Sequence, residues 1–488
     1  MQLVPLSRSA ADSVSGSITH EAFWHLPEMV REQRQVQVRK LTASNLADVE
    51  PRETAGVRQY EAQQPPLYYT LLSPAYRALR HLSLPAQVLA LRLISVTIAS
   101  GVVFVSNALT RLLLPGVGFS ILLPGLLACL PGLFINVCRV GNESLSIVLC
   151  GLVLLLMVKV TRSGLQMRLW AMLGVVLGSA LLTKAYALCF LPLLPAVAGL
   201  SMARTRSHRG KIMAGMLASF GLAFLVAGWW YLRTWFTTGT LSGEQLDVAA
   251  SAGRTLSSKL SAVVQVNWRS VIDSAAFTHI WIGGWSFLTA RTWMYRTCEM
   301  IAAIAFAGIV TFLVRYVRFL NTARRPGASG AGIIVALAFY LCLCAALVYY
   351  ALVVHLTQGI SMALGWYLYG AVVAEVLLMT VGLMTAFGLR YAQIAVGSIC
   401  VLACALDLYT TQFLLMPYYS GFSSQYLRGI QIANVKLVFS RLAINEAQAI
   451  TPTIVAGAWA AYLGTTMVLA AIAVRTVLVE HRRMPARF

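Results

Sequence analysis

The sequence predicts an all-α, polytopic integral membrane protein. Of its 488 residues 58% are hydrophobic and 11% are charged, whereas soluble domains average about 45–50% apolar and about 25% charged residues. The mean hydropathy is +0.73, and the apolar residues gather into segments long enough to span a bilayer. This composition excludes an ordinary soluble enzyme, a disordered protein and a secreted disulfide scaffold.

A bilayer-spanning helix needs roughly 20 mostly apolar residues, and the chain offers eleven candidates. The fourth and fifth are short and close together. The candidates are 88–112, 117–137, 143–160, 168–184, 186–202, 211–233, 299–318, 330–354, 366–388, 391–412 and 455–476.

The net charge of +21 is distributed unevenly between alternate connections. One set holds most of the arginines and lysines, including the C-terminal tail, while the other set holds only Arg139 and Lys184 in its short members. Basic connections face the cytoplasm, so we expect a cytoplasmic C-terminus and an extracytoplasmic N-terminus. No nucleic-acid-binding motif accompanies the charge, so we expect membrane lipids and no nucleic acid as partners.

This topology divides the chain into alternating loop and membrane regions. We expect a first membrane span that is missing or truncated before the polar N-terminal segment. The regions are an extracytoplasmic N-terminal loop with an interfacial helix (1–87), helices 1–6 (88–233), a large extracytoplasmic loop (234–298), helices 7–10 (299–412), a second extracytoplasmic loop (413–454), and the last helix with a basic cytoplasmic tail (455–488).

The segment YEAQQPPLYY, residues 60–69, is the most specific motif. Paired prolines end a preceding helix and favour the first turn of a following one. Residues 67–82 carry aromatic residues with Arg77 and Arg80, which is typical of an amphipathic helix lying in the membrane interface. The helix is either a plain interfacial element or a lid over a lipid-linked substrate, with Glu61 and Gln64 as hydrogen-bonding groups.

Three charged residues, Arg92, Glu375 and Asp407, lie within apolar segments, where a charge indicates function or pairing. Asp407 is near the outer end of its segment, where solvent can reach it. Glu375 is deeper, so we expect it either to contact substrate or to pair with Arg92 or a tyrosine hydroxyl. Lys184 lies between two short apolar runs, where an unpaired charge costs at least about 2.5–3.5 kcal/mol.

Together with YEAQQPPLYY, five shorter motifs resemble the bacterial GT-C glycosyltransferases. These enzymes are related to protein O-mannosyltransferases and lipid A aminoarabinose transferases. The resemblance spans roughly residues 20–390, and the motifs share the predicted outer side. They are GNESL (141–145), LLTK (181–184), WYLRTW (230–235) with Gly239, WIGGW (281–285) and GWYLY (365–369).

The resemblance implies a GT-C fold in a bacterial inner membrane and a polyprenyl-phosphate-sugar donor. The acceptor would be a lipid, a glycan or a protein at the outer face. In such a reaction a carboxylate accepts the proton of the acceptor hydroxyl and cations stabilise the departing phosphate. The implied base is Glu21, with Glu61 as the alternative. The implied substrate-binding residues are His20, His25, Gln64, Tyr68, Tyr69, Glu143, Lys184, Arg233 and Tyr367.

Departures from the family pattern keep two other functions open. His20 stands where the family has aspartate, and Thr234 stands where it has asparagine. The alternatives are a flippase or transporter for lipid-linked sugars, and a catalytically silent homologue that acts as an assembly subunit. The sequence does not separate an enzyme from these two.

No motif indicates a cofactor, and a divalent cation is left open. The segment HEAFWH, residues 20–25, resembles a zinc motif, but its histidines are five residues apart. That spacing turns them about 140° apart on a helix, so we predict no metal site. The nine cysteines include no CxxC pair and lie in or beside apolar segments, as small buried residues do.

Overall fold

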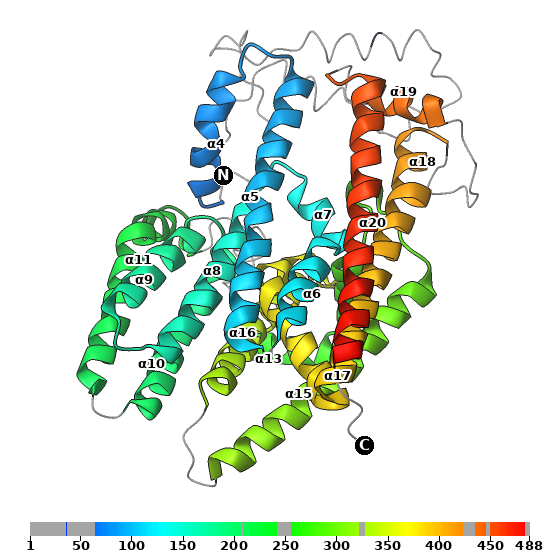
Figure 1. The fold of residues 1–488 in the computed structure, drawn as a ribbon. Coiled ribbons are helices and arrows are strands. Elements are labelled where there is room, and N and C mark those ends of the chain that lie inside the picture. Colours follow the sequence, from blue (N-terminus) through cyan, green and yellow to red (C-terminus); the bar gives the residue numbers. More distant parts are fainter. Residues whose placement is uncertain are drawn as a thin grey trace.

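The computed structural model describes residues 36, 64–114, 116–205, 208–241, 255–321, 327–422, 435–445 and 449–483. All regular structure in these ranges is helical, and the long apolar helices confirm an all-α polytopic membrane protein. Figure 1 shows the helices arranged as a bundle with its longest members side by side. The predicted residues His20, Glu21, His25 and Glu61 lie outside the described residues.

The first half of the bundle comprises α4 (Leu67–Ala78), α5 (Leu84–Leu113), α6 (Val117–Ala128), α7 (Pro131–Val137), α8 (Glu143–Arg162), α9 (Met167–Leu181), η2 (Ala185–Phe190), α10 (Leu193–Arg204) and α11 (Arg209–Thr238). The second half comprises α13 (Leu256–Gln265), α14 (Trp268–Ile280), η4 (Gly284–Ser286), α15 (Thr292–Asn321), α16 (Ala328–Gln358), η5 (Gly365–Ala371), α17 (Val372–Tyr409), η6 (Thr410–Leu415), α18 (Met416–Tyr419), α19 (Val435–Asn445) and α20 (Pro452–Arg483).

The number of spans differs from the predicted eleven. Nine helices in the described ranges are long and apolar enough to cross a membrane, or ten if the pair α6–α7, bent by 59°, is one span. The break lies at Pro131, which begins α7. The predicted fourth span forms α9, whose 15 residues extend about 22 Å, less than the roughly 30 Å hydrocarbon core. Hydropathy located each apolar segment and marked the fourth and fifth as short, but it did not detect the break.

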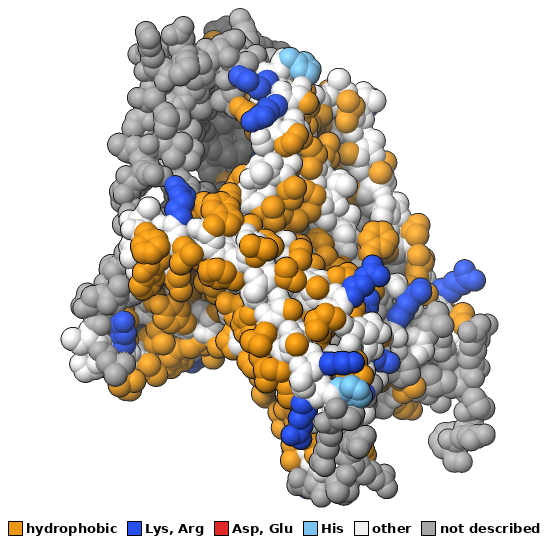
Figure 2. Space-filling model, turned by 90° about the vertical axis from the view of Figure 1, so that its left-hand side faces the viewer, with side chains coloured by type: hydrophobic (Ala, Val, Ile, Leu, Met, Phe, Trp, Pro, Cys, Tyr) orange, Lys and Arg blue, Asp and Glu red, His pale blue; other side chains and the backbone are white. Residues whose placement is uncertain are grey.

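Helix α8 forms the centre of the bundle, and α15 and α20 lie at its edge. In the most apolar window of α8, 72% of the residues are buried, against 17% in α15 and 11% in α20. Helices α5, α9, α10 and α16 pack around α8. Apolar side chains cover much of the face on the α9–α11 side, and Lys and Arg lie at its top, at its right-hand edge and toward its lower end (Figure 2). This distribution suits a bundle surrounded by lipid.

Glycines let two helix pairs approach closely, as small residues do in membrane proteins. Gly174 of α9 lies against the backbone of Ser219 in α11, and a Cβ there would be 2.6 Å from the Ser219 carbonyl oxygen. At the crossing of α15 and α17, a Cβ on Gly308 would be 1.9 Å from the Gly382 carbonyl oxygen. Neither contact has room for a side chain.

Helix α17 contains a sharp break that separates two candidate spans. Gly388 has φ +79°, a left-handed conformation that favours glycine. The spans on either side are Gly365–Leu389 and Tyr391–Tyr419. The chain therefore forms a helical hairpin with almost no loop.

Helix α4 begins directly after Pro65–Pro66, where the paired prolines predict a helix start. It ends at Ala78, earlier than the predicted limit at residue 82. Figure 1 shows α4 folded back along the first part of α5, with the two axes running side by side. Its 12 residues reach about 18 Å, too short to span a bilayer, and its location at the interface stays a prediction.

Candidate functional site

A polar cluster lies where four separate chain segments meet at one end of α8. We call it the Lys184 cluster, and its members are Gln64, Asn142, Glu143, Lys184, Tyr186 and Tyr367. Helix α8 begins at Glu143, and Lys184 lies in the extended link between the end of α9 and η2. Tyr367 comes from η5, and Gln64 precedes α4.

The centre of the cluster is an ion pair between the Lys184 ammonium and the Glu143 carboxylate. Lys184 is 6% exposed, whereas the Glu143 side chain retains 27% of its exposure. The rings of Tyr186 and Tyr367 each lie 5.6 Å from the Lys184 Nζ, a distance at which an aromatic ring attracts a cation. Glu143 is the first residue of α8, where the helix dipole also favours a negative charge.

Hydrogen bonds join the diproline segment to both turns that hold the ion pair. The Leu67 amide donates to the Leu182 carbonyl at 2.9 Å. The Asn142 Nδ2 donates to the Thr183 carbonyl at 3.0 Å and contacts the Gln64 Oε1 at 3.4 Å. The start of α4 is therefore positioned on the GNESL and LLTK motifs.

Tyr68 anchors α4 to α5 beside this cluster. Its ring is fully buried, and its hydroxyl lies 2.6 Å from the Ser95 Oγ. Burial raises the pKa of Tyr68, and the nearby Glu143 carboxylate adds to that rise. The ring of Tyr69 packs edge-on against Tyr68 at 5.1 Å and is 37% exposed.

A second ionic contact, the His279–Glu375 pair, lies on the other side of η5. The His279 Nε2 is 2.8 Å from the Glu375 Oε1, and the His279 Nδ1 is 3.1 Å from the Gly365 carbonyl oxygen. Both ring nitrogens face acceptors, so both contacts are hydrogen bonds when the ring is an imidazolium. Burial by itself lowers the pKa of His279, but the Glu375 carboxylate and the two hydrogen bonds outweigh it and raise this pKa above its ordinary value.

Helix η5 connects the two ionic contacts. It places Tyr367 over Lys184, while the Tyr369 hydroxyl donates to the His279 carbonyl. The Tyr186 ring covers Gly370, where a Cβ would be 2.8 Å from its hydroxyl. The GWYLY motif is thus a rigid junction between the start of α8 and α14.

The structure brings together most of the sequence-predicted site residues that it describes. Gln64, Glu143, Lys184 and Tyr367 meet in the cluster, with Tyr68 and Tyr69 beside it. Arg233 does not join them: it is exposed on α11, with its guanidinium 5.3 Å from the Trp230 ring.

The two acidic residues of the apolar segments have different surroundings from those predicted. Glu375 pairs with His279 and not with Arg92 or a tyrosine. Asp407 is 6% exposed instead of solvated, and the Tyr462 hydroxyl donates to its Oδ2 at 2.6 Å. His279 and Tyr186 lie outside the sequence motifs and were not predicted as site residues. The one signal for His279 was that Glu375, in an apolar segment, needs a partner.

No group of three or more His, Cys, Asp or Glu residues with metal-binding geometry occurs among the described residues. No protein-family model, curated protein or solved structure matches this chain.

Proposed function

We propose that this chain is a membrane glycosyltransferase of the GT-C type. It moves a sugar from a polyprenyl-phosphate-linked donor to a lipid, glycan or protein at the outer face of a bacterial inner membrane. One observation carries the proposal: the diproline, GNESL, LLTK and GWYLY segments, selected separately in the sequence, meet around one buried cation.

The cation has the chemistry that a departing phosphate requires. Charge that develops on a leaving group is stabilised best by a donor held in a water-poor site, and Lys184 is buried and fixed between two rings. In this proposal the donor phosphate replaces Glu143 as the partner of Lys184. Glu143, the more exposed member of the pair, moves away with its charge.

The base that accepts the hydroxyl proton is Glu21 or Glu61, both outside the described residues. Glu61 precedes Gln64 by three residues, so the chain keeps their Cα atoms within about 11 Å. That tether supports Glu61 as a group near the Lys184 cluster. Glu21 is supported by its place in the motif that resembles the family.

The distribution of basic residues supports an extracytoplasmic site. In the proposed topology, the N-terminal segment and the starts of α8 and η5 face outward, and the C-terminus faces the cytoplasm. The arginines and lysines at the opposite helix ends, such as Lys159 and Arg162 at the end of α8, then face inward.

One observation favours a second candidate, the catalytically silent homologue. Glu143 already neutralises Lys184 in this structure, as a purely structural ion pair would do. In that case the cluster joins α8 to the end of α9, and the protein acts as an assembly subunit.

Sugar transfer from polyprenyl-phosphate donors in proteoliposomes tests the proposal. We expect Lys184→Gln to lower turnover about 10²–10³-fold, the effect of losing one charge-stabilising donor. Glu21→Gln should lower it about 10²–10⁴-fold if Glu21 is the base. Glu50→Gln, in the same N-terminal segment, is the matched control and should leave turnover unchanged.

Three results would count against the enzyme. Wild-type turnover in the Lys184→Gln protein would remove Lys184 from the reaction. Absence of transfer by the wild type across donor sugars would favour the silent homologue. Movement of the lipid-linked sugar between leaflets without transfer would favour the transport alternative.

A further inference from the structure

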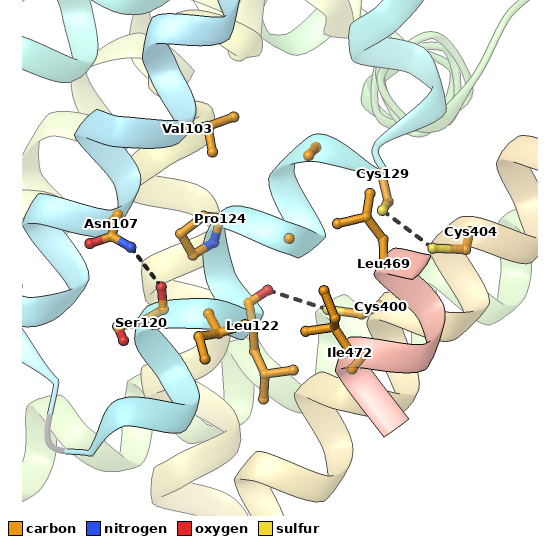
Figure 3. Close-up of a pocket in the computed structure, with 14 residues that line it drawn as sticks. Val103, Asn107, Ser120, Leu122, Pro124, Cys129, Cys400, Cys404, Leu469 and Ile472 are labelled. Atoms are coloured by element: carbon orange, nitrogen blue, oxygen red, sulfur yellow. Dashed lines mark hydrogen bonds between the residues drawn. The ribbon is translucent and has the colours of Figure 1, made fainter. Parts of the chain in front are cut away.

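An apolar groove lies between α5 and α20, over α6 (Figure 1). Its cavity is ≈ 300 Å³ and is formed by α5, α6, α17 and α20. Figure 3 shows α6 at its floor, with side chains of α5 and α20 on either side. Its lining residues include Asn107, Ile121, Gly125, Cys404 and Ile472.

Two donors in this groove are already bonded within the protein. The Asn107 Nδ2 donates to the Ser120 carbonyl at 2.9 Å, and the Cys400 thiol donates to the Leu122 carbonyl at 3.3 Å. The groove therefore offers an apolar guest almost no competing polar surface. A volume of ≈ 300 Å³ is at the lower limit of the about 300–1,000 Å³ range of small-molecule sites, so it suits part of a guest molecule.

The open side of the groove faces the lipid. Ile121 is 43% and Ile472 is 40% exposed, and both belong to apolar helices of the membrane region. At this depth the solvent consists of hydrocarbon chains. An apolar groove that opens at this depth is therefore filled by a hydrocarbon chain.

Two arginines lie beyond one end of the groove. Arg111 follows Asn107 by four residues on α5, and Arg475 follows Ile472 by three residues on α20; these spacings place each arginine on the groove-facing side of its helix, one turn further along. Both are exposed, and neither pairs with an acidic side chain in the described part of the chain. Figure 1 shows α5 and α20 running in the same direction.

We propose that this groove binds one acyl chain of an anionic glycerophospholipid, whose phosphate is held by Arg111 and Arg475. The apolar cavity accounts for the chain, and the two cations account for the headgroup charge. The site belongs to helices and a face separate from the Lys184 cluster, so it does not depend on the proposed function.

A large side chain introduced at Gly125 should fill the groove. A Cβ at Gly125 has nothing within 4 Å, and the same holds for Gly221 on the far helix α11. Gly125→Phe should lower the occupancy of phosphatidylglycerol at least tenfold in native mass spectrometry of the delipidated full-length protein with added lipid. Gly221→Phe is the matched control and should bind as the wild type does.

The headgroup contacts are tested by comparing phosphatidylglycerol with phosphatidylcholine of the same acyl chains. The wild type should prefer phosphatidylglycerol at least tenfold, and the double variant Arg111→Gln/Arg475→Gln should lose this preference. Arg77→Gln/Arg80→Gln, at the end of α4 and in the link to α5, should keep it.

A crosslinking measurement tests the site without any substitution. Phosphatidylglycerol with a diazirine in its acyl chain should label α6 and the Cys400–Cys404 turn of α17. Labelling elsewhere, unchanged binding by Gly125→Phe, or an unchanged preference in the double arginine variant would overturn the proposal. Displacement of phosphatidylglycerol by an equal concentration of polyprenyl phosphate would also overturn it, because the groove would then prefer an isoprenoid chain.

Discussion

Lys184–Glu143 and His279–Glu375 are two partly buried ionic contacts beside the same short helix, η5, yet they differ in how each responds when a partner is lost. Lysine carries its charge on a single ammonium that accepts no hydrogen bond. A histidine can become a neutral ring and still donate one hydrogen bond. The first contact is therefore a fixed charge pair, whereas the second can be relieved by the loss of a proton.

This difference suits different roles for the two sides of η5. A fixed cation beside a partly exposed carboxylate can exchange that carboxylate for another anion. A histidine between a backbone carbonyl and a carboxylate positions α14 against α17. The substitutions below test whether the two contacts differ in this way.

The largest expected effect is that of Lys184→Met. It leaves the partly exposed Glu143 carboxylate without its cation, which costs up to the about 3–5 kcal/mol of a fully buried pair. The melting temperature of the purified protein in detergent should fall by several degrees. The double variant Lys184→Met/Glu143→Gln removes both charges and should recover most of the loss; an equally unstable double variant would show that the charge pair is not the cause.

A smaller loss is expected for His279→Gln, about 1–3 kcal/mol for one broken buried hydrogen bond to a charged group. At pH 6 the melting temperature of His279→Gln should be higher than that of Lys184→Met. The reverse order would contradict the distinction between the two contacts.

The two contacts should also differ in their response to pH. Because the pKa of His279 is raised in the folded protein above its ordinary value of 6.5, its stabilisation is complete below that value and is lost as the pH rises through the raised pKa. The slope cannot exceed about 1.4 kcal/mol per pH unit, the value for one proton. Melting temperatures between pH 5.5 and 9 should show this fall for the wild type and for Lys184→Met, and His279→Gln should lack it.

The smallest effect is expected for Tyr68→Phe, which removes the hydroxyl bonded to Ser95. One neutral hydrogen bond contributes about 0.5–1.5 kcal/mol. A double-mutant cycle with Ser95→Ala in the melting assay measures the coupling. A coupling near zero would mean that the ring of Tyr68, and not its hydroxyl, anchors α4 to α5.

Hydropathy predicted the membrane helices because each must place about 20 apolar residues in the bilayer, but it did not predict their breaks. Pro131 lies inside an apolar segment, and the average over a window conceals the 59° bend between α6 and α7. The fourth segment is short in the sequence, and it forms the 15-residue helix α9, which Lys184 and the apolar residues of η2 follow directly.

The site was predicted in part. The cost of a buried lysine marked Lys184 as a residue needing a partner, and the motifs supplied Glu143, Gln64 and Tyr367 without indicating how they pair. The His279–Glu375 contact joins residues 96 positions apart, and no local periodicity records such a contact. Arg233 was predicted from the WYLRTW motif, but it is exposed on α11 and does not join the cluster.

The tight turn at Gly388 has a consequence for the order in which the protein is made. Since the spans Gly365–Leu389 and Tyr391–Tyr419 have almost no loop between them, they must enter the bilayer together during synthesis. His279 is already made when Glu375 enters, but Tyr462, the partner of Asp407, belongs to the last helix and does not yet exist. Asp407 therefore waits in the nascent protein without its partner, at a cost of up to about 2.5–3.5 kcal/mol for an aspartate at bilayer depth, until α20 arrives and completes the bundle.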